Sequence, residues 1–251
     1  MDFKIKDRYD IEDFLKIMAL LRAPDGCPWD RVQTHESIRR NMIEEAYEVV
    51  DAIDQEDQPG MQEELGDVLM QVLFHARIEE ERGNFSFADV VDGACKKLVF
   101  RHPFVFGDAP KSTAENAISD WESQKKIEKA QKSQTDSMRS VPRMFPALIR
   151  SSKLQEKAAR SQLDWHSAEE PLRHAESILH QLLEKEKRPE AEELQQMIGK
   201  LLFYIVGAAR LNGVEPEAAL TFTSDHFLDQ FAQYESAGSN LSEINPTDLI
   251  D

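Results

Sequence analysis

Apolar residues recur at intervals of three and four positions along most of the chain, which is the period of an amphipathic α-helix. The strict alternation of apolar and polar residues that marks a half-buried strand is absent. The pattern therefore predicts an all-α fold. The expected helices span residues 10–22, 35–54, 59–82, 86–100, 113–132, 144–160, 170–187, 190–212 and 215–236.

The chain divides near its middle. A polar stretch from Lys129 to Arg139 runs into Pro142 and Pro146, which predicts a break between helices. Before the break, Gly66–Arg77 aligns with Gly199–Arg210 at an offset of 133 residues, so the two halves are expected to fold alike. Chance similarity between two amphipathic helices is the alternative. The expected divisions are a first domain at 1–132, a linker at 133–142, a second domain at 143–236 and a polar tail at 237–251.

Charge narrows the possible partners. The 251 residues include 47 Asp and Glu against 30 Lys and Arg, a net charge of -17. Such an acidic chain is unsuited to a nucleic-acid polymer or an anionic membrane, because both require a basic surface. The only cysteines, Cys27 and Cys95, cannot form a disulfide framework, and no segment has the composition of a signal peptide or a membrane span. We expect a cytoplasmic protein that binds neither a nucleic-acid polymer nor a membrane.

Two predicted helices carry closely spaced acids. Glu45 and Glu48 are three residues apart, as are Glu64 and Asp67, so each pair shares one helix face. If the helices are antiparallel neighbours joined near Pro59–Gly60, the four carboxylates converge. The apolar positions of the same helices are expected to supply the core, with the acids at its border. They are Ile43, Ala46, Val49, Val50, Ile53, Leu65, Val68, Leu69, Val72 and Leu73.

Converging carboxylates repel one another, and a divalent cation would neutralise them. Mg²⁺ prefers oxygen ligands and is commonly held by a few carboxylates together with substrate phosphates. A di-iron bundle would use Glu-x-x-His pairs, and the sequence contains none. A solvated acidic helix face is the alternative to a metal site at this stage.

Other residues carry possible chemistry beside a plain structural role. Thr34 is expected to cap the helix that carries the first acids. Lys97 and Arg101 are four residues apart at a helix end, where they could meet one anionic ligand or remain solvated cations. Trp29 could stack on a nucleobase or pin its loop. His75 is expected to be a core or rim histidine.

Together these residues resemble the MazG family of nucleoside triphosphate pyrophosphohydrolases. The matching segments are GCPWD at 26–30, QTH at 33–35, EEAYE at 44–48, ELGD at 64–67, KLVFRHPFVF at 97–106, VPRMFPAL at 141–148 and DW at 164–165.

The resemblance implies an all-α homodimer that hydrolyses a nucleoside triphosphate to the monophosphate and pyrophosphate. It implies Mg²⁺ as the cofactor, with Mn²⁺ as a substitute, and a role in nucleotide-pool housecleaning. A non-catalytic helical regulator that binds nucleotide or a protein through the acidic groove is the alternative function. The implied roles are metal ligation by Glu45, Glu48, Glu64 and Asp67, support or water orientation by Glu44, and substrate binding by Lys97, Arg101 and Trp29.

The second half lacks these residues. At the 133-residue offset, the five acids correspond to Ser177, Ile178, Gln181, Met197 and Lys200. With a four-residue gap, the basic pair corresponds to His226 and Gln230. The sequence therefore predicts two tandem MazG-like helical bundles, of which the second is a degenerate repeat kept for packing or dimerisation.

Overall fold

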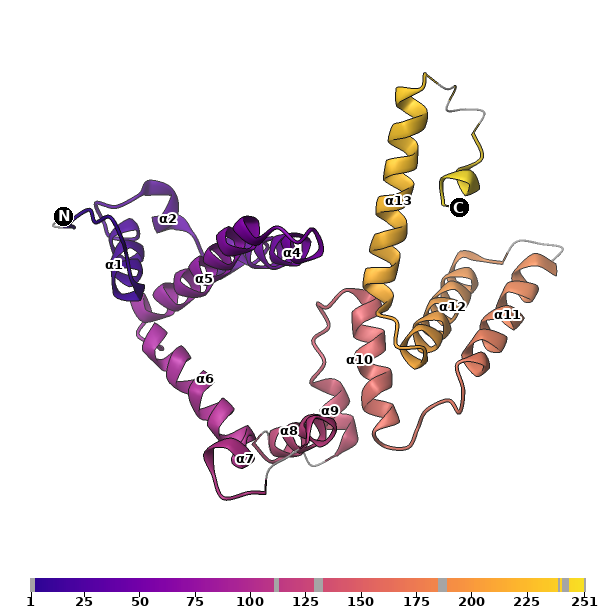
Figure 1. Ribbon diagram of the computed structural model, residues 1–251, viewed down its shortest axis with the longest axis horizontal. Coiled ribbons are helices and arrows are strands. Elements are labelled where there is room, and N and C mark those ends of the chain that lie inside the picture. The colour runs from indigo at the N-terminus through magenta and orange to yellow at the C-terminus, as the bar shows by residue number, and fades with distance from the viewer. Residues whose placement is uncertain are drawn as a thin grey trace. The chain divides into compact units, whose positions relative to one another are not determined.

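The computed structural model describes residues 3–110, 113–128, 133–184, 189–238, 240 and 244–250. All secondary-structure elements in the described ranges are helices, which confirms the all-α prediction (Figure 1). The chain forms two compact units, Met1–Gln124 and Lys125–Asp251. The last residues of the expected helices at 113–132 and 170–187 fall partly outside the described ranges.

The first unit is built around one long helix. Its helices are α1 (Ile11–Leu21), α2 (Pro28–Val32), α3 (His35–Ile38), α4 (Asn41–Asp54), α5 (Gln58–Glu81), α6 (Phe87–Arg101), α7 (Pro103–Phe106) and the first part of α8 (Ala114–Glu128). α4 packs along α5, and α1, α3 and α6 also contact α5. The buried cluster of Met18, Ile38, Phe74 and Ile78 joins α1 and α3 to the second half of α5.

Local polar residues set the helix ends. Asp10 and Ser86 form capping boxes at the starts of α1 and α6. Thr34 caps a helix as predicted, but that helix is the four-residue α3. The chain turns at 39–40 before α4 begins, so the expected continuous helix over 35–54 is broken.

The connection between the two acidic helices lies where the predicted helix ends place it. α4 ends at Asp54 and α5 begins at Gln58, with Asp57 as its N-cap. Pro59 and Gly60 therefore lie in the first turn of α5, where a proline needs no backbone N–H donor. The predicted junction near Pro59–Gly60 is thus confirmed to within a few residues, and the two helices pack against each other.

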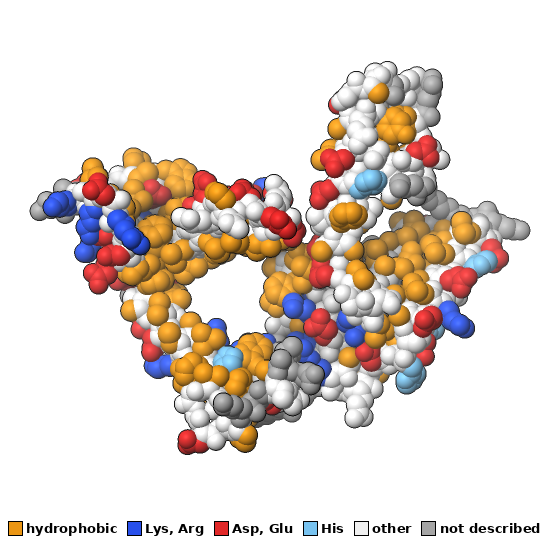
Figure 2. All heavy atoms as spheres, in the orientation of Figure 1, with side chains coloured by type: hydrophobic (Ala, Val, Ile, Leu, Met, Phe, Trp, Pro, Cys, Tyr) orange, Lys and Arg blue, Asp and Glu red, His pale blue; other side chains and the backbone are white. Residues whose placement is uncertain are grey.

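Part of the predicted core is exposed. Leu73 is buried, but six apolar side chains of α4 and α5 remain 36 to 53% exposed, and we call them the apolar face. They are Ile43, Tyr47, Val50, Ile53, Leu65 and Leu69. All of these except Tyr47 were expected in the core, and that expectation is wrong for them, because the described residues of the first unit leave this face of the α4–α5 pair uncovered. Figure 2 shows hydrophobic side chains at the surface of both units.

The second unit is also helical. It contains α9 (Gln134–Arg139), α10 (Ala147–Ala159), α11 (Glu169–Glu184), α12 (Ala191–Leu211), α13 (Pro216–Ser236) and the 3₁₀ helix η2 (Pro246–Leu249). α11 packs along α12, which also contacts α10 and α13. A Cβ on Gly207 would come within 2.4 Å of the Trp165 ring, so this glycine lets the indole lie directly on α12.

Two expected boundaries differ from the structure. The predicted linker contains α9, which packs on α10 through buried Ser137, whose hydroxyl accepts a hydrogen bond from Lys157 Nζ at 2.8 Å. The predicted tail contains η2, which contacts α13 and buries Leu249. No single described helix is long and apolar enough to cross a membrane, and only the bent pair α12–α13 meets that criterion when the two are taken together.

Candidate metal centre

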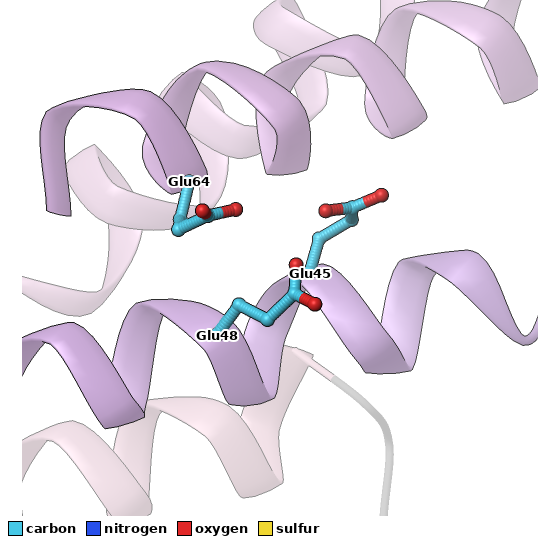
Figure 3. Close-up of side chains that lie close together, drawn as sticks. All are labelled: Glu45, Glu48 and Glu64. Carbon is cyan, nitrogen blue, oxygen red and sulfur yellow. The ribbon is translucent and has the colours of Figure 1, made fainter. Parts of the chain in front are cut away.

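Three glutamates meet between α4 and α5. Glu45 and Glu48 lie on one face of α4, and Glu64 lies on α5 opposite them (Figure 3). A carboxylate oxygen from each lies within 4.8 Å of one from each of the others. The spacing of three residues on α4 and the packing of α4 on α5 thus produce the convergence that the sequence predicted for these three acids.

Asp67 lies one helical turn beyond Glu64 on α5. It is outside the 4.8 Å group, which is the one such group among the described residues. Its charge nevertheless raises the pKa values of both Glu45 and Glu64. The structure therefore gathers three of the four predicted acids and places the fourth within electrostatic reach.

Glu45 and Glu64 have pKa values above that of an isolated glutamate. Burial is the largest cause of the raised pKa of Glu45, followed by its hydrogen bond with Glu48 and the charges of Asp67 and Glu48. Burial also leads for Glu64, whose pKa is raised further by the charges of Glu48 and Asp67. Without a cation, the cluster is a site of mutual repulsion.

The donor set fits a hard divalent cation. All three groups offer oxygen, and no cysteine or histidine belongs to the cluster, which distinguishes it from a typical zinc site. Two oxygens bound to octahedral Mg²⁺ at about 2.1 Å are about 3.0 Å apart when they are neighbours and about 4.2 Å apart only when they lie on opposite sides of the ion. The carboxylate oxygens of the cluster lie within 4.8 Å of one another, so the flexible glutamate side chains would close in by up to about 2 Å to share one ion.

Gln71 is a site neighbour that the sequence reasoning missed. It follows Asp67 by one turn of α5, is 6% exposed, and donates from Nε2 to Glu45 Oε1 at 3.4 Å. The available signal was its position as the lone polar residue in the run Val68–Phe74.

A second polar group lies farther along α5. His75 Nδ1 is 2.7 Å from Nδ1 of His35 on α3, and the two rings stack with centroids 4.9 Å apart. His35 Nε2 lies 2.6 Å from Glu79, whose pKa is lowered to about 2 by hydrogen bonds, of which that of Asn84 is the largest and that of His35 the next. His75 is half-buried, as expected, and this contact pairs it with His35 to tie α3 to α5.

The remaining predicted acid, Glu44, lies beside Glu45 on α4 but outside the three-glutamate group. Its carboxylate pairs at 2.7 Å with Arg40, the N-cap residue of α4. Trp29 lies on α2, and its side chain is largely exposed. The predicted roles of Glu44 and Trp29 stay predictions.

The two predicted cations differ in environment. Lys97 is exposed on α6, whereas Arg101 is 4% exposed and holds its guanidinium 4.6 Å from the centre of the Trp121 ring. Both lie near the C-terminal end of α6, which Figure 1 shows well apart from α4 within this unit. A single chain therefore does not bring this end of α6 to the acidic cluster.

Comparison with known proteins identifies the fold around this cluster. Residues 33–106 match the MazG nucleotide pyrophosphohydrolase domain, a range that contains all five predicted acids and both predicted cations. A relative from Thermotoga maritima, named nucleoside triphosphate pyrophosphohydrolase/pyrophosphatase MazG, is 40% identical over 224 residues, covering 89% of this chain and 85% of the relative. The chain belongs to the MazG family.

Other similar proteins match the chain across both units. The nucleoside triphosphate pyrophosphohydrolase of Escherichia coli K12 is 36% identical over 228 residues, 90% of this chain and 87% of the relative. Bacillus subtilis protein YabN is 39% identical over 246 residues, 96% of this chain, but the match covers only 50% of YabN.

The second unit of this MazG protein differs at the corresponding positions. Ile178 and Met197, which align with Glu45 and Glu64 at the 133-residue offset, are both buried. Lys200, which aligns with Asp67, lines a surface hollow with Trp165 and Tyr204. In the described part of this unit, no group of acids or histidines is arranged to hold a metal ion.

Proposed function

We propose that this protein hydrolyses nucleoside triphosphates and deoxynucleoside triphosphates to the monophosphate and pyrophosphate, in a reaction that depends on Mg²⁺ or Mn²⁺. The observation that carries the proposal is the convergence of Glu45, Glu48 and Glu64 in a MazG-family domain. The names of the relatives support the same reaction.

The proposed site works mainly by positioning and by neutralising charge. Glu45, Glu48, Glu64 and Asp67 would hold the cation, and Glu44 would support them or orient water. A bound Mg²⁺ would supply positive charge for the phosphates and make water a better nucleophile. Attack of water at the α-phosphorus breaks its bond to the bridging oxygen, and pyrophosphate leaves with that oxygen.

The substrate would need cations and a surface for the base. Lys97 and Arg101 are proposed to bind the phosphates, because charge-assisted contacts suit a triphosphate. Trp29 is exposed and offers an aromatic face for a nucleobase.

A homodimer would complete this site. The apolar face leaves six large side chains of α4 and α5 uncovered, as expected when a second copy buries them. Lys97 and Arg101 lie away from the acids of their own chain, so we propose that the partner copy supplies them. The second unit is proposed to serve packing or dimerisation without its own chemistry.

The proposed cellular role is housecleaning of the nucleotide pool in the cytoplasm. Hydrolysis to the monophosphate removes a triphosphate from use by polymerases, and the acidic chain is unsuited to binding a nucleic-acid polymer.

Product analysis tests the proposed reaction. Purified protein is incubated with a panel of NTPs and dNTPs in Mg²⁺ or in EDTA, and monophosphate, diphosphate, phosphate and pyrophosphate are quantified. Equal yields of monophosphate and pyrophosphate in Mg²⁺, with no turnover in EDTA, are expected. Nucleotide binding without turnover would favour the non-catalytic regulator, and full activity in EDTA would overturn the metal requirement.

A further inference from the structure

Gln71 is buried beside the acidic cluster. Its side chain is 6% exposed and lies in a stretch of α5 whose other members, Val68–Met70 and Val72–Phe74, are apolar. Burying an amide costs free energy unless both its donor and its acceptor find partners. A glutamine at this position therefore requires a specific interaction to offset that cost.

The amide nitrogen of Gln71 has one partner. Nε2 donates to Glu45 Oε1 at 3.4 Å, across the packing of α5 on α4. This hydrogen bond favours the ionised form of Glu45, against the burial that disfavours it. The opposite amide orientation would point the carbonyl oxygen at a carboxylate, where the two would repel each other.

The amide oxygen of Gln71 has no partner. Oε1 is one of three buried side-chain atoms without a hydrogen bond among the described residues. Since Nε2 is directed to Glu45, this acceptor is left beside a cluster that would hold a hydrated cation. Water is the smallest donor that could satisfy it.

We propose that Gln71 is a positioning residue of the metal centre: its N–H orients the Glu45 carboxylate, and its carbonyl oxygen accepts a hydrogen bond from water at the site. The inference rests on the proposed function, because it assumes that the glutamates hold a cation. Gln71 itself is not a metal ligand in this proposal. Residues that orient ligands in this way commonly control metal affinity.

Direct metal binding tests the proposal. Mn²⁺ is titrated into metal-free wild type and Gln71→Met, and free Mn²⁺ is followed by electron paramagnetic resonance without substrate. Methionine is similar in length but lacks the amide. We expect Mn²⁺ to bind the variant about 10- to 100-fold more weakly, the range seen when a group that supports a metal ligand is removed. The melting temperature of the metal-free variant should stay close to that of wild type, because removal of the unpaired amide oxygen offsets loss of the hydrogen bond to Glu45.

Matched variants separate positioning from folding. Gln62→Met makes the same change at an exposed position on α5, and it should leave Mn²⁺ affinity unchanged. Gln71→Asn keeps the amide but shortens its reach, so it should also weaken Mn²⁺ binding, and it provides the test if Gln71→Met does not fold. In turnover assays, the Mg²⁺ concentration for half-maximal rate should rise, while KM for nucleotide at saturating Mg²⁺ stays close to wild type.

The outcomes are distinct. Unchanged Mn²⁺ affinity in folded Gln71→Met, or in Gln71→Asn if the first is unfolded, would overturn the role of Gln71. A wild type that binds Mn²⁺ but releases no pyrophosphate would reject the proposed reaction and leave this inference standing. A wild type that binds no Mn²⁺ would reject both.

Discussion

At the scale of single residues, the acidic cluster that is proposed to bind the metal lowers the stability of the metal-free protein. Glu45 and Glu64 have raised pKa values, so the folded protein takes up protons there more readily than the unfolded chain. The stability linked to this uptake is fully present below the usual glutamate pKa and is lost as pH rises through the raised values. At neutral pH the cluster therefore destabilises metal-free protein, and bound cation should reverse the effect.

This argument makes a prediction for Glu45→Gln. The variant removes one charge from the cluster, so its melting temperature in EDTA at neutral pH should exceed that of wild type. It should also lose most of the stabilisation that Mg²⁺ gives to wild type. Thermal melts with and without Mg²⁺ measure both effects, and a lower melting temperature in EDTA would show that Glu45 is not held under repulsion.

The histidine pair predicts a separate pH dependence. The pKa of His75 is lowered by burial first and by the charge of His35 second. The unfolded chain therefore binds this proton more readily, and stability falls as pH drops below the ordinary histidine pKa of about 6.5. The lowered pKa of Glu79 also stabilises the folded protein, and this contribution is lost as pH falls from the usual glutamate pKa to about 2.

His75→Phe tests that dependence because phenylalanine keeps a ring against His35 but cannot titrate. When the pH is lowered from 7.5 to 5.5, the melting temperature of His75→Phe should fall less than that of wild type. These two pH values lie about one unit above and below the ordinary histidine pKa. His180→Gln changes an exposed histidine of α11 and should keep the wild-type slope. Identical slopes for wild type and His75→Phe would contradict the assignment.

At the scale of helices, the proposed dimer can be tested by complementation. Glu48→Gln should lack a working acidic cluster, and Lys97→Glu should lack a working basic end of α6. If each site combines acids of one chain with cations of the other, random exchange makes half the dimers mixed, with one complete site in each. Mixing equal amounts should then restore about one quarter of wild-type activity.

The control for complementation is each variant incubated alone under the same conditions. The subunits must exchange, which mass spectrometry of differently labelled chains can follow. Exchange without recovery of pyrophosphate release would contradict the shared site.

Leu65→Lys tests the apolar face itself. Compared with Leu65→Met, it should weaken the dimer measured by light scattering, because an ammonium group would enter the apolar face.

The sequence predicted the positions of the helices better than it predicted which helix faces are buried. Periodic apolar residues placed α1, α5, α6 and α12 within one or two residues of their observed ends. The same periodicity cannot say whether an apolar stripe is covered by its own chain, so the exposure of Leu65 was missed. The three-residue spacing of acids on one helix face predicted the convergence of Glu45, Glu48 and Glu64, whereas the partner of Gln71 depends on packing between helices.

At the scale of the whole molecule, only the first of the two units is predicted to carry catalytic activity. Ile178 and Met197 are buried where the repeat alignment would place two acids, and apolar side chains cannot bind Mg²⁺. A truncated protein of residues 125–251, which keeps α9, should be helical by circular dichroism and hydrolyse no nucleotide. Pyrophosphate release from this fragment at a rate comparable to the full chain would overturn the assignment.

The central claim is that the first unit holds the single metal-dependent pyrophosphohydrolase site, and Glu48→Gln tests it most directly. The change is nearly isosteric and removes one charge from the cluster. We measure pyrophosphate release by full-length wild type and variant, at saturating Mg²⁺ and equal concentrations of protein with matching circular dichroism. The account predicts that wild type releases pyrophosphate and that the variant loses at least about 100-fold in rate, with no residual slow phase. A folded variant that keeps about half or more of the wild-type rate would contradict it.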